Sequence, residues 1–214
     1  MSDWHCEALG VRQQRALKEL GPVLRRQGAY LAGDTAIALH LGHRVSVDLD
    51  FFQSQSLGDP HRFGEELRSE RYGAIPFQSR QITAKAIHGT VRQVKVLLMP
   101  YPYLRIRRLR RCSELNCDVA ALDDLAAMKL AAVCQRASKK DFVDVWALLK
   151  SGRTLRGMLT AYQRKFDVRD VAHVLYQLAD FEDVDAQPMP RMRWKTTWKQ
   201  VKESLGQAIK SLRT

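Results

Sequence analysis

The stretch from Tyr30 to Phe52, Y-L-A-G-D-T-A-I-A-L-H-L-G-H-R-V-S-V-D-L-D-F-F, decides which fold this chain is expected to adopt. A short apolar run ends at Gly33, and a segment compatible with a helix follows directly. A second apolar run, Val47 to Phe52, carries Asp48 and Asp50 on alternate residues. Because the side chains of a strand alternate between its two faces, these aspartates are expected to project from the same face.

These features suit the binding of a metal ion and phosphate groups. Mg²⁺ is typically held by one or two carboxylates together with substrate phosphates, so Asp48 and Asp50 are candidate metal ligands. A glycine at a strand-to-helix turn lets the backbone approach a phosphate, which makes Gly33, Asp34 and Thr35 candidate nucleotide contacts. Taken alone, Gly33 and Asp34 equally suit an ordinary turn glycine and an ordinary helix N-cap.

The character of the chain changes near Ala120. Short apolar segments separated by turns precede it, with His88-Gly89 predicting a hairpin turn, and an alanine-rich helix through Arg136 follows it. The pattern predicts an α/β (α+β) domain over residues 1–119. A helical domain that ends in a basic tail helix is expected over residues 120–214.

The run from Gly33 to Phe52 resembles the pattern G-[GSD]-T-A-x-A-L-x-L-G-H-R-x-S-x-D-L-D-F-F of the AbiEii/AbiGii-type nucleotidyltransferase toxins. A second run, Asp123 to Leu149, looks like the signature K-L-x-A-x-x-x-R-x-x-x-K-D-x-x-D of the same family. This family belongs to the DNA polymerase β-like superfamily. The resemblance therefore implies a polymerase β-like mixed sheet with helices, followed by a C-terminal helical bundle.

The resemblance also implies roles for residues of the helical half. Lys129 would bind the triphosphate or balance its charge, and Arg136, two helical turns away, shares its face and would contact the nucleotide. Asp141 would order Lys129 or act as a base for the incoming hydroxyl. The plainer alternative is a surface ion pair of Arg136 or Lys140 with Asp144, worth well under about 1 kcal/mol.

Two further residues are assigned to the nucleotide site. Arg44 would either pair with phosphate or neutralise the acidic strand. Ser46 shares the face of Asp48 and Asp50, so it would contact the nucleotide or the metal, or form only a supporting hydrogen bond. His43 is expected to be structural.

The chain departs from the family pattern in two respects. The family mostly has Gly-Gly or Gly-Ser where this chain has Gly33-Asp34, and a carboxylate beside a triphosphate is repulsive unless a cation offsets it. Polymerase β-like enzymes usually draw a third carboxylate from a neighbouring strand, yet no acidic residue occurs between Glu70 and Glu114. A third anionic group must therefore come from outside the sheet.

The charge of the chain predicts a polyanionic partner. The formal net charge is +12, from 35 lysines and arginines against 23 aspartates and glutamates. We expect an RNA backbone footprint on two basic segments. The residues in question are Arg105, Arg107, Arg108, Arg110, Arg111, Lys195 and Lys199. For the second segment, the competing interpretation is a packed C-terminal helix with a solvated basic face.

No apolar run approaches the ~20 residues that a membrane helix needs, so no membrane partner is expected. The N-terminus lacks an apolar signal region, which predicts a cytoplasmic location.

The resemblance implies a toxin of a toxin–antitoxin system. Such an enzyme would use Mg²⁺ or Mn²⁺ to transfer a nucleotide from an NTP to an RNA acceptor, for which the family suggests the tRNA 3′ end, with release of pyrophosphate. A cognate antitoxin would be its partner. Two alternatives stay open: an enzyme that nucleotidylates a protein hydroxyl, and a non-catalytic nucleotide- or RNA-binding module whose site has decayed.

Overall fold

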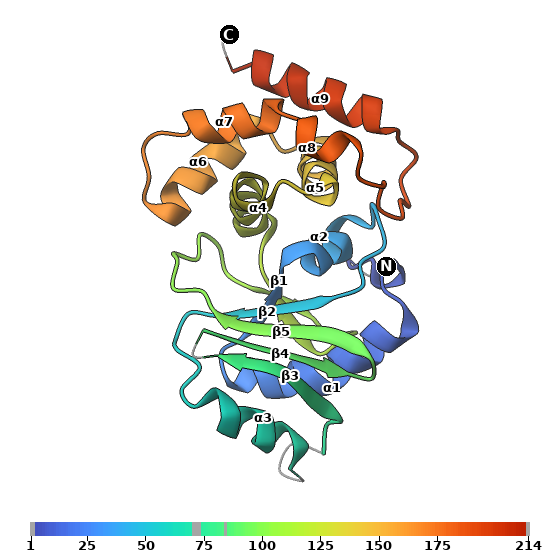
Figure 1. Ribbon diagram of the computed structural model, residues 1–214, viewed down its shortest axis with the longest axis vertical. Helices are drawn as coiled ribbons and strands as arrows, with labels where there is room; N and C mark the ends of the chain where they lie inside the picture. Colours follow the sequence, from blue (N-terminus) through green and yellow to red (C-terminus); the bar gives the residue numbers. More distant parts are fainter. Residues whose placement is uncertain (1–2, 70–73, 84, 213–214) are drawn as a thin grey trace.

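A computed structural model describes residues 3–69, 74–83 and 85–212. Figure 1 shows a sheet with helices in one half of the molecule and a group of helices in the other. The elements, in chain order, are η1 (Cys6–Ala8), α1 (Val11–Arg26), β1 (Tyr30–Ala32), α2 (Gly33–Leu41), β2 (Leu49–Gln53), α3 (Pro60–Arg68), β3 (Phe77–Thr83), β4 (Ala86–Val91), β5 (Val94–Pro100), β6 (Arg110–Cys112), β7 (Cys117–Val119), α4 (Leu122–Arg136), α5 (Lys139–Lys150), α6 (Leu155–Phe166), α7 (Ala172–Ala179), α8 (Glu182–Asp185) and α9 (Trp198–Lys210).

The described strands form one mixed sheet in the order β3-β4-β5-β2-β1-β7-β6. The β2–β5 and β1–β7 pairs are parallel, and the other neighbours are antiparallel. In this register Asp50 of β2 lies opposite Ala32 of β1 on one side and Leu97 of β5 on the other. The α/β fold class predicted from the sequence is therefore confirmed.

Strand β2 separates apolar from acidic side chains by simple alternation. Leu49 and Phe51 are almost completely buried, whereas Asp50 between them is only half-buried. Burying these large apolar side chains fixes the register, because a shift by one residue would turn them outward and the aspartate inward. The same burial therefore directs the acidic side chain to the opposite face.

The predicted hairpin turn at His88-Gly89 is wrong, because both residues lie inside β4. The turn between β4 and β5 is Arg92-Gln93, and both residues have the positive φ that two-residue hairpins require. Packing of a neighbouring side chain, and not a turn, requires a glycine at Gly89. A Cβ there would lie 2.4 Å from ring atoms of Phe77, which crosses over this position.

The helical half follows the sheet in the chain. Helix α2 contacts both α4 and α5, so the turn at Gly33 lies where the two halves of the molecule meet. Ala126, Ala127 and Leu130 of α4 are buried, and the small alanines allow neighbouring helices to approach closely. Among the described helices, none combines the length and apolarity needed to span a lipid bilayer. The division at residue 120 stays a prediction.

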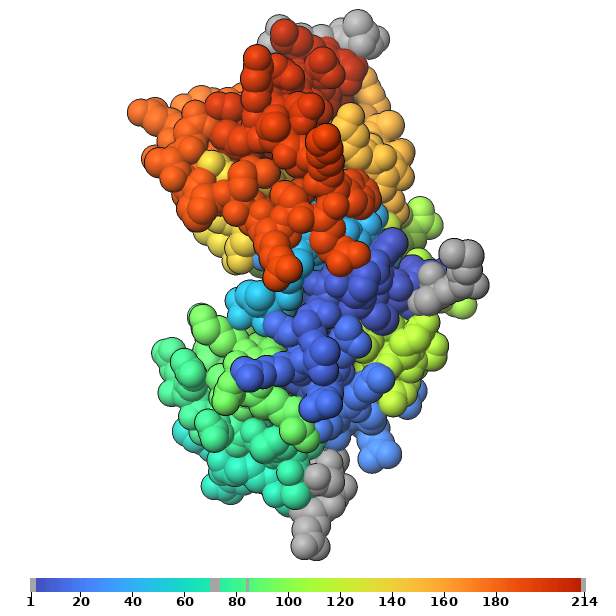
Figure 2. Space-filling view, turned by 90° about the vertical axis from the view of Figure 1, so that its right-hand side faces the viewer, coloured from blue at the N-terminus to red at the C-terminus, as the bar shows by residue number. Residues whose placement is uncertain are grey.

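The segment before α9 returns to the N-terminal half. In Figure 2 it extends down from the helices, in orange-red, to the blue N-terminal residues. The backbone N–H of Val45 donates to the carbonyl of Arg191 at 2.9 Å, and that of Arg193 donates to His43 at 2.8 Å. Arg193 also donates through Nη1 to the carbonyl of Glu7 at 2.9 Å. These bonds hold the segment that leads to Asp48.

Candidate active site

Gly33 marks the turn from β1 into α2. Its φ is +64°, in the left-handed region that favours glycine. A Cβ at this position would lie 2.8 Å from Oδ2 of Asp50, closer than real Cβ atoms come to a neighbour. The glycine therefore lets the backbone at the start of α2 approach the carboxylate of Asp50.

The second aspartate of the pair is held through its backbone. The buried hydroxyl of Thr35 donates to the carbonyl oxygen of Asp48 and lies 2.7 Å from Oγ of Ser46. Both hydroxyls thus connect the start of α2 to the segment before β2. The cavity described below is not lined by either Thr35 or Ser46, although both were predicted to contact the nucleotide.

The carboxylates of Asp48 and Asp50 themselves are left without a neutralising contact. Within residues 3–69, 74–83 and 85–212, neither carboxylate forms an ion pair or a hydrogen bond. Burial, together with the negative charges of Asp34 and Asp48, raises the pKa of Asp50 to about 6. The two side chains are therefore oxygen ligands of the kind that a divalent cation prefers, and they have no competing partner in the described part.

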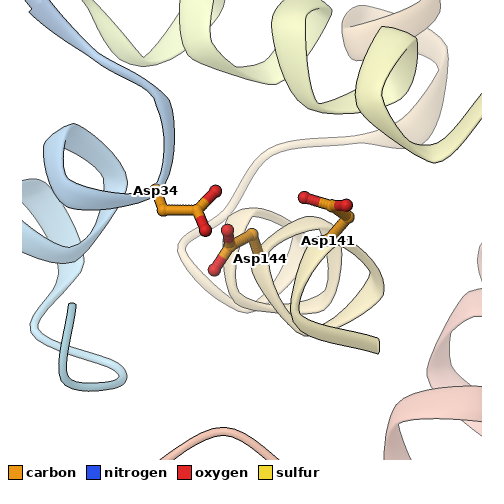
Figure 3. Close-up of side chains that lie close together, drawn as sticks. All are labelled: Asp34, Asp141 and Asp144. Atoms are coloured by element: carbon orange, nitrogen blue, oxygen red, sulfur yellow. The ribbon is translucent and has the colours of Figure 1, made fainter. Parts of the chain in front are cut away.

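A second acidic cluster, called here the paired cluster, consists of Asp34, Asp141 and Asp144. In Figure 3 the three carboxylates converge, Asp34 from the start of α2 and the other two from α5. One oxygen of each lies within 4.8 Å of the others. The ammonium of Lys129 ion-pairs with all three, at 2.7 Å to Asp141 and 2.9 Å to Asp144. Lys129 thus supplies the positive charge that a metal ion would otherwise bring.

Arg44 and His43 complete the inner side of the paired cluster. Arg44 donates to Asp144 through Nε at 2.6 Å and Nη2 at 2.8 Å, and its Nη2 lies 3.2 Å from Asp34. His43 Nε2 lies 2.7 Å from the same Asp144 carboxylate. Asp144 is fully buried, so the interpretation of this residue as a surface ion-pair partner is wrong. Arg44 neutralises acidic groups and does not line the cavity.

Burial alone would raise the pKa values of these three carboxyl groups. The pKa of Asp34 is nevertheless held below its usual range by Lys129 and Arg44, and that of Asp144 well below it by the same two cations. For Asp141 the main opposing cause is the hydrogen bond from Arg136. The three carboxylates of the paired cluster are therefore ionised, and the neighbouring cations of the protein neutralise them.

Two cations lie at the outer side of the paired cluster. Arg136 donates to both oxygens of Asp141 at 2.9 Å, and its side chain is half-exposed. Lys140, which the sequence offered only as a partner of Asp144, instead lies 2.8 Å from Asp34. These charges offset the carboxylate of Asp34, which the sequence had identified as the obstacle to binding a triphosphate.

A cavity of about 900 Å³ lies between the sheet and the helical half. One part of its lining is charged and another part is apolar and largely aromatic, with Lys85 as a further cation beside the apolar part. The charged end is lined by Gly33, Asp34, Asp50, Lys129 and Arg136. The apolar end is lined by Phe52, Met99, Tyr101, Tyr103, Met128, Tyr162 and Phe166. A cavity of this volume, with a few polar groups gathered at one end, is typical of a small-molecule site.

The aromatic end is continuous. Ring centroids are 4.8 Å apart for Tyr101 and Tyr103, 5.0 Å for Tyr103 and Phe166, and 4.8 Å for Phe166 and Tyr162. These residues were not among those predicted for the site. The one signal for them was Tyr101-Pro102-Tyr103 directly after a strand, whereas Tyr162 and Phe166 are brought in by tertiary packing.

A buried ion pair fixes the loop that carries these tyrosines. Asp124 accepts hydrogen bonds from the backbone N–H groups of Ile106 and Arg107, both at 2.9 Å. Lys165 lies 2.8 Å from Asp124 and donates to the carbonyl of Leu104 at 2.9 Å. The loop therefore has a defined position against the helical half.

The neighbouring strand supplies no third carboxylate. The residue beside Asp50 on β5 is Leu97, as the acid-free sequence of this strand required. Asp34 is the additional acid whose charge acts most strongly on Asp50, and it comes from α2.

Four of the predicted RNA-binding residues form ion pairs at the surface. Arg107 lies 2.8 Å from Asp123, Arg110 3.2 Å from Asp3 and Arg111 3.5 Å from Asp118. Lys199 lies 3.9 Å from Glu203. Arg105, Arg108 and Lys195 are exposed. Their role in RNA binding stays a prediction.

Solved structures show that the fold is that of nucleotidyltransferases. MenT4, a nucleotidyltransferase toxin from Mycobacterium tuberculosis H37Rv, superposes with a TM-score of 0.60 at 13% identity over 94% of this chain and 82% of that one. JHP933 from Helicobacter pylori superposes with a TM-score of 0.56 at 15% identity over 94% and 88% of the two chains. At these identities the likeness concerns the fold alone.

The family is shown by sequence. Residues 99–208, just over half of the chain, match the family described as nucleotidyl transferase AbiEii toxin, type IV toxin–antitoxin system. The chain therefore belongs to the AbiEii family of nucleotidyltransferase toxins, as the resemblance had implied. The uncharacterised protein aq_aa25 of Aquifex aeolicus (strain VF5) is 27% identical over 204 residues, which is 94% of this chain and 96% of that protein. The matched residues of the family begin after Asp48 and Asp50, so these two rest on the geometry described above.

Proposed function

We propose that this nucleotidyltransferase uses a divalent metal ion to transfer a nucleotide from an NTP to the 3′ end of an RNA, with tRNA as the expected acceptor. The observation that carries the proposal is the two-ended cavity, which has an aspartate and cations at one end and aromatic rings at the other. A nucleotide has the same division between its phosphates and its base.

The nucleotide would lie with its base against Tyr101, Tyr103 and Phe166. Aromatic rings accept any base by stacking, so this end gives affinity with little discrimination between bases. The triphosphate would extend toward Gly33 and the start of α2, where the backbone N–H groups of a helix N-terminus favour an anion.

The metal ion would be held by Asp48 and Asp50. Two half-buried carboxylates, one in β2 and one just before it, line the same hollow and have no cation partner in the described part, which fits Mg²⁺ or Mn²⁺. A metal bound there would neutralise the phosphates and bring the acceptor hydroxyl toward the α-phosphorus. A bond then forms from the hydroxyl oxygen to this phosphorus, the bond to the pyrophosphate oxygen breaks, and a proton is released to water.

The helical half would balance the charge of the triphosphate. Arg136 and Lys140 are partly exposed at the edge of the paired cluster, and Lys129 lines the cavity. The contacts of Asp141 favour a role in positioning Lys129 and Arg136 over a role as a base, because both its oxygens accept hydrogen bonds and its pKa is lowered.

A transfer assay tests the proposal. Purified protein is incubated with each labelled NTP, with Mg²⁺, Mn²⁺ or a chelator, and with total tRNA or cell lysate. Metal-dependent label on the 3′ end of tRNA is the expected result. Label on protein would favour nucleotidylation of a side-chain hydroxyl, and nucleotide binding without transfer would favour a decayed site.

The proposal includes a cognate antitoxin and a cytoplasmic location. Expression of the chain with and without its neighbouring reading frame tests the first, since growth arrest should be relieved by the correct neighbour. Fractionation of the producing cells tests the second.

A further inference from the structure

The aspartate pair borders two hollows. Asp50 lines the large cavity and, together with Asp48, also lines a second hollow of about 400 Å³, which meets the cavity at Asp50 and Leu97. The second hollow lies over β3, β4 and β5. Its lining includes the basic side chains Arg80 and Lys95 and the imidazole of His88.

The sheet places these side chains on the face that carries the aspartates. Leu97 is the parallel partner of Asp50, and His88 of β4 is the antiparallel partner of Leu97. Lys95 is two residues before Leu97, so alternation puts it on the same face. Arg80 stands at the irregularity of β3, between Ser79 and Gln81, where the register with β4 shifts.

Arg80 and Lys95 are available for an external anion. Both are exposed, and within the described residues neither forms an ion pair or a hydrogen bond. Several other exposed arginines behave differently, since Arg92, Arg107 and Arg110 each have a carboxylate partner. Among the described residues, the acidic side chains that line the second hollow are the two aspartates.

We infer that the second hollow is the acceptor subsite, and that Arg80 and Lys95 bind phosphate groups of a nucleic-acid acceptor. The inference rests on the proposed function. In-line displacement requires the attacking hydroxyl and the departing pyrophosphate on opposite sides of the α-phosphorus. The second hollow meets the large cavity at Asp50 and Leu97, so an acceptor bound there would reach the same carboxylate as a nucleotide in the large cavity.

The chemistry of the subsite selects the class of acceptor. A strand whose last phosphates reach Arg80 and Lys95 brings its terminal hydroxyl to Asp48 and Asp50. A protein hydroxyl carries no such phosphates and gains nothing from the two cations. The acceptor is therefore a nucleic-acid end.

The test is the double charge reversal Arg80→Glu with Lys95→Glu in the full-length protein. Its matched control is Lys18→Glu with Arg26→Glu, which reverses two exposed cations of α1 that border neither hollow. For each protein, transfer to tRNA is measured against RNA and salt concentration, and affinity for a fluorescent NTP analogue is measured separately. Thermal unfolding checks that both variants are folded.

We expect the KM for tRNA to be at least roughly tenfold higher in the test variant. The slope of log affinity for tRNA against log salt concentration should become shallower by about one to two. Its affinity for the NTP analogue should stay within about twofold of wild type, and the control should match wild type throughout. The milder pair Arg80→Ala with Lys95→Ala should show a smaller change in the same direction.

Three results would overturn the inference: an unchanged KM for tRNA, an equal loss of NTP affinity, or label that moves to protein and is insensitive to the charge reversal. Absence of transfer to RNA by the wild-type protein is a different outcome, because it rejects the proposed function on which the inference depends.

Discussion

Two acidic groups lie near the start of α2, one with Asp34 and one with Asp50, and they differ in their neighbours. Asp34, Asp141 and Asp144 surround the ammonium of Lys129 and are further neutralised from both sides. Asp48 and Asp50 face two hollows with no cation in contact among the described residues. The denser cluster, which looks more like a metal centre, already contains its cation. The sparser pair is the one proposed here to hold the metal.

The difference shows that proximity of carboxylates does not identify a metal site. Charge balance decides, because a buried carboxylate is tolerated only when a cation or hydrogen-bond donors compensate it. In the paired cluster that compensation is built into the fold. Asp50 has no such compensating partner among the described residues, and its pKa is accordingly raised to about 6.

The largest effect should come from Asp50→Asn. Removal of this carboxylate should lower nucleotide transfer by roughly 10²–10³-fold or more, the loss typical when one group is removed from a preorganised electrostatic site. Thermal stability should stay the same or rise, because the variant no longer holds a poorly compensated charge. Asp183→Asn, an exposed acid on α8, is the control for a simple change of charge. Wild-type transfer by Asp50→Asn would exclude this residue as a metal ligand.

Asp144→Asn, unlike Asp50→Asn, should lower the free energy of unfolding. The variant leaves Arg44 buried and without its main partner, which typically costs about 3–5 kcal/mol. Urea unfolding monitored by circular dichroism measures the loss. A change below about 1 kcal/mol would mean that the paired cluster contributes no more than a surface ion pair does.

Gly33→Ala tests the contact between α2 and the aspartate pair. Its backbone strain should cost about 2 kcal/mol, and the displaced Asp50 carboxylate should lower transfer as well. Gly58→Ala is a matched control, since Gly58 has φ +65° and open space around its Cβ. The control should lose stability only. Equal transfer by both variants would show that the close approach of Gly33 to Asp50 does not contribute to activity.

The smallest effect concerns acid sensitivity. His40 is buried, and desolvation lowers its pKa to about 4 from the ordinary 6.5. As the pH falls, this histidine is therefore protonated in the unfolded chain before it is protonated in the folded protein. The contribution of the neutral His40 to the free energy of unfolding is complete above pH 6.5 and is lost as the pH falls toward 4. The paired carboxylates stay ionised in this range, because their pKa values are lowered below 3.8.

His40→Gln should recover about 1 kcal/mol of the stability that the wild type loses between pH 7.5 and pH 5.5. Unfolding midpoints in urea at the two pH values measure it. An identical acid loss in the variant would assign the sensitivity to another group.

Local sequence predicted the strand that carries Asp50 and the turn at Gly33, because strand alternation and this turn depend on near neighbours. It failed at Gly89, where a turn was predicted but packing against Phe77 requires the glycine. It also failed for Asp144, whose main partner Arg44 lies 100 residues away along the chain. Ion-pair partners and burial at that separation are set by tertiary packing, which spacing within a helix does not report.

The order of synthesis gives the hydrogen bonds of Arg191 and Arg193 a biological meaning. Val45 and His43, just before Asp48, are made early, whereas their partners are made much later in synthesis. Because domains generally fold as units from the N-terminus during synthesis, the segment before the aspartate pair has to wait for Arg191 and Arg193. We expect a nascent toxin to be inactive until this segment has been made, which would give its producer time to make the antidote.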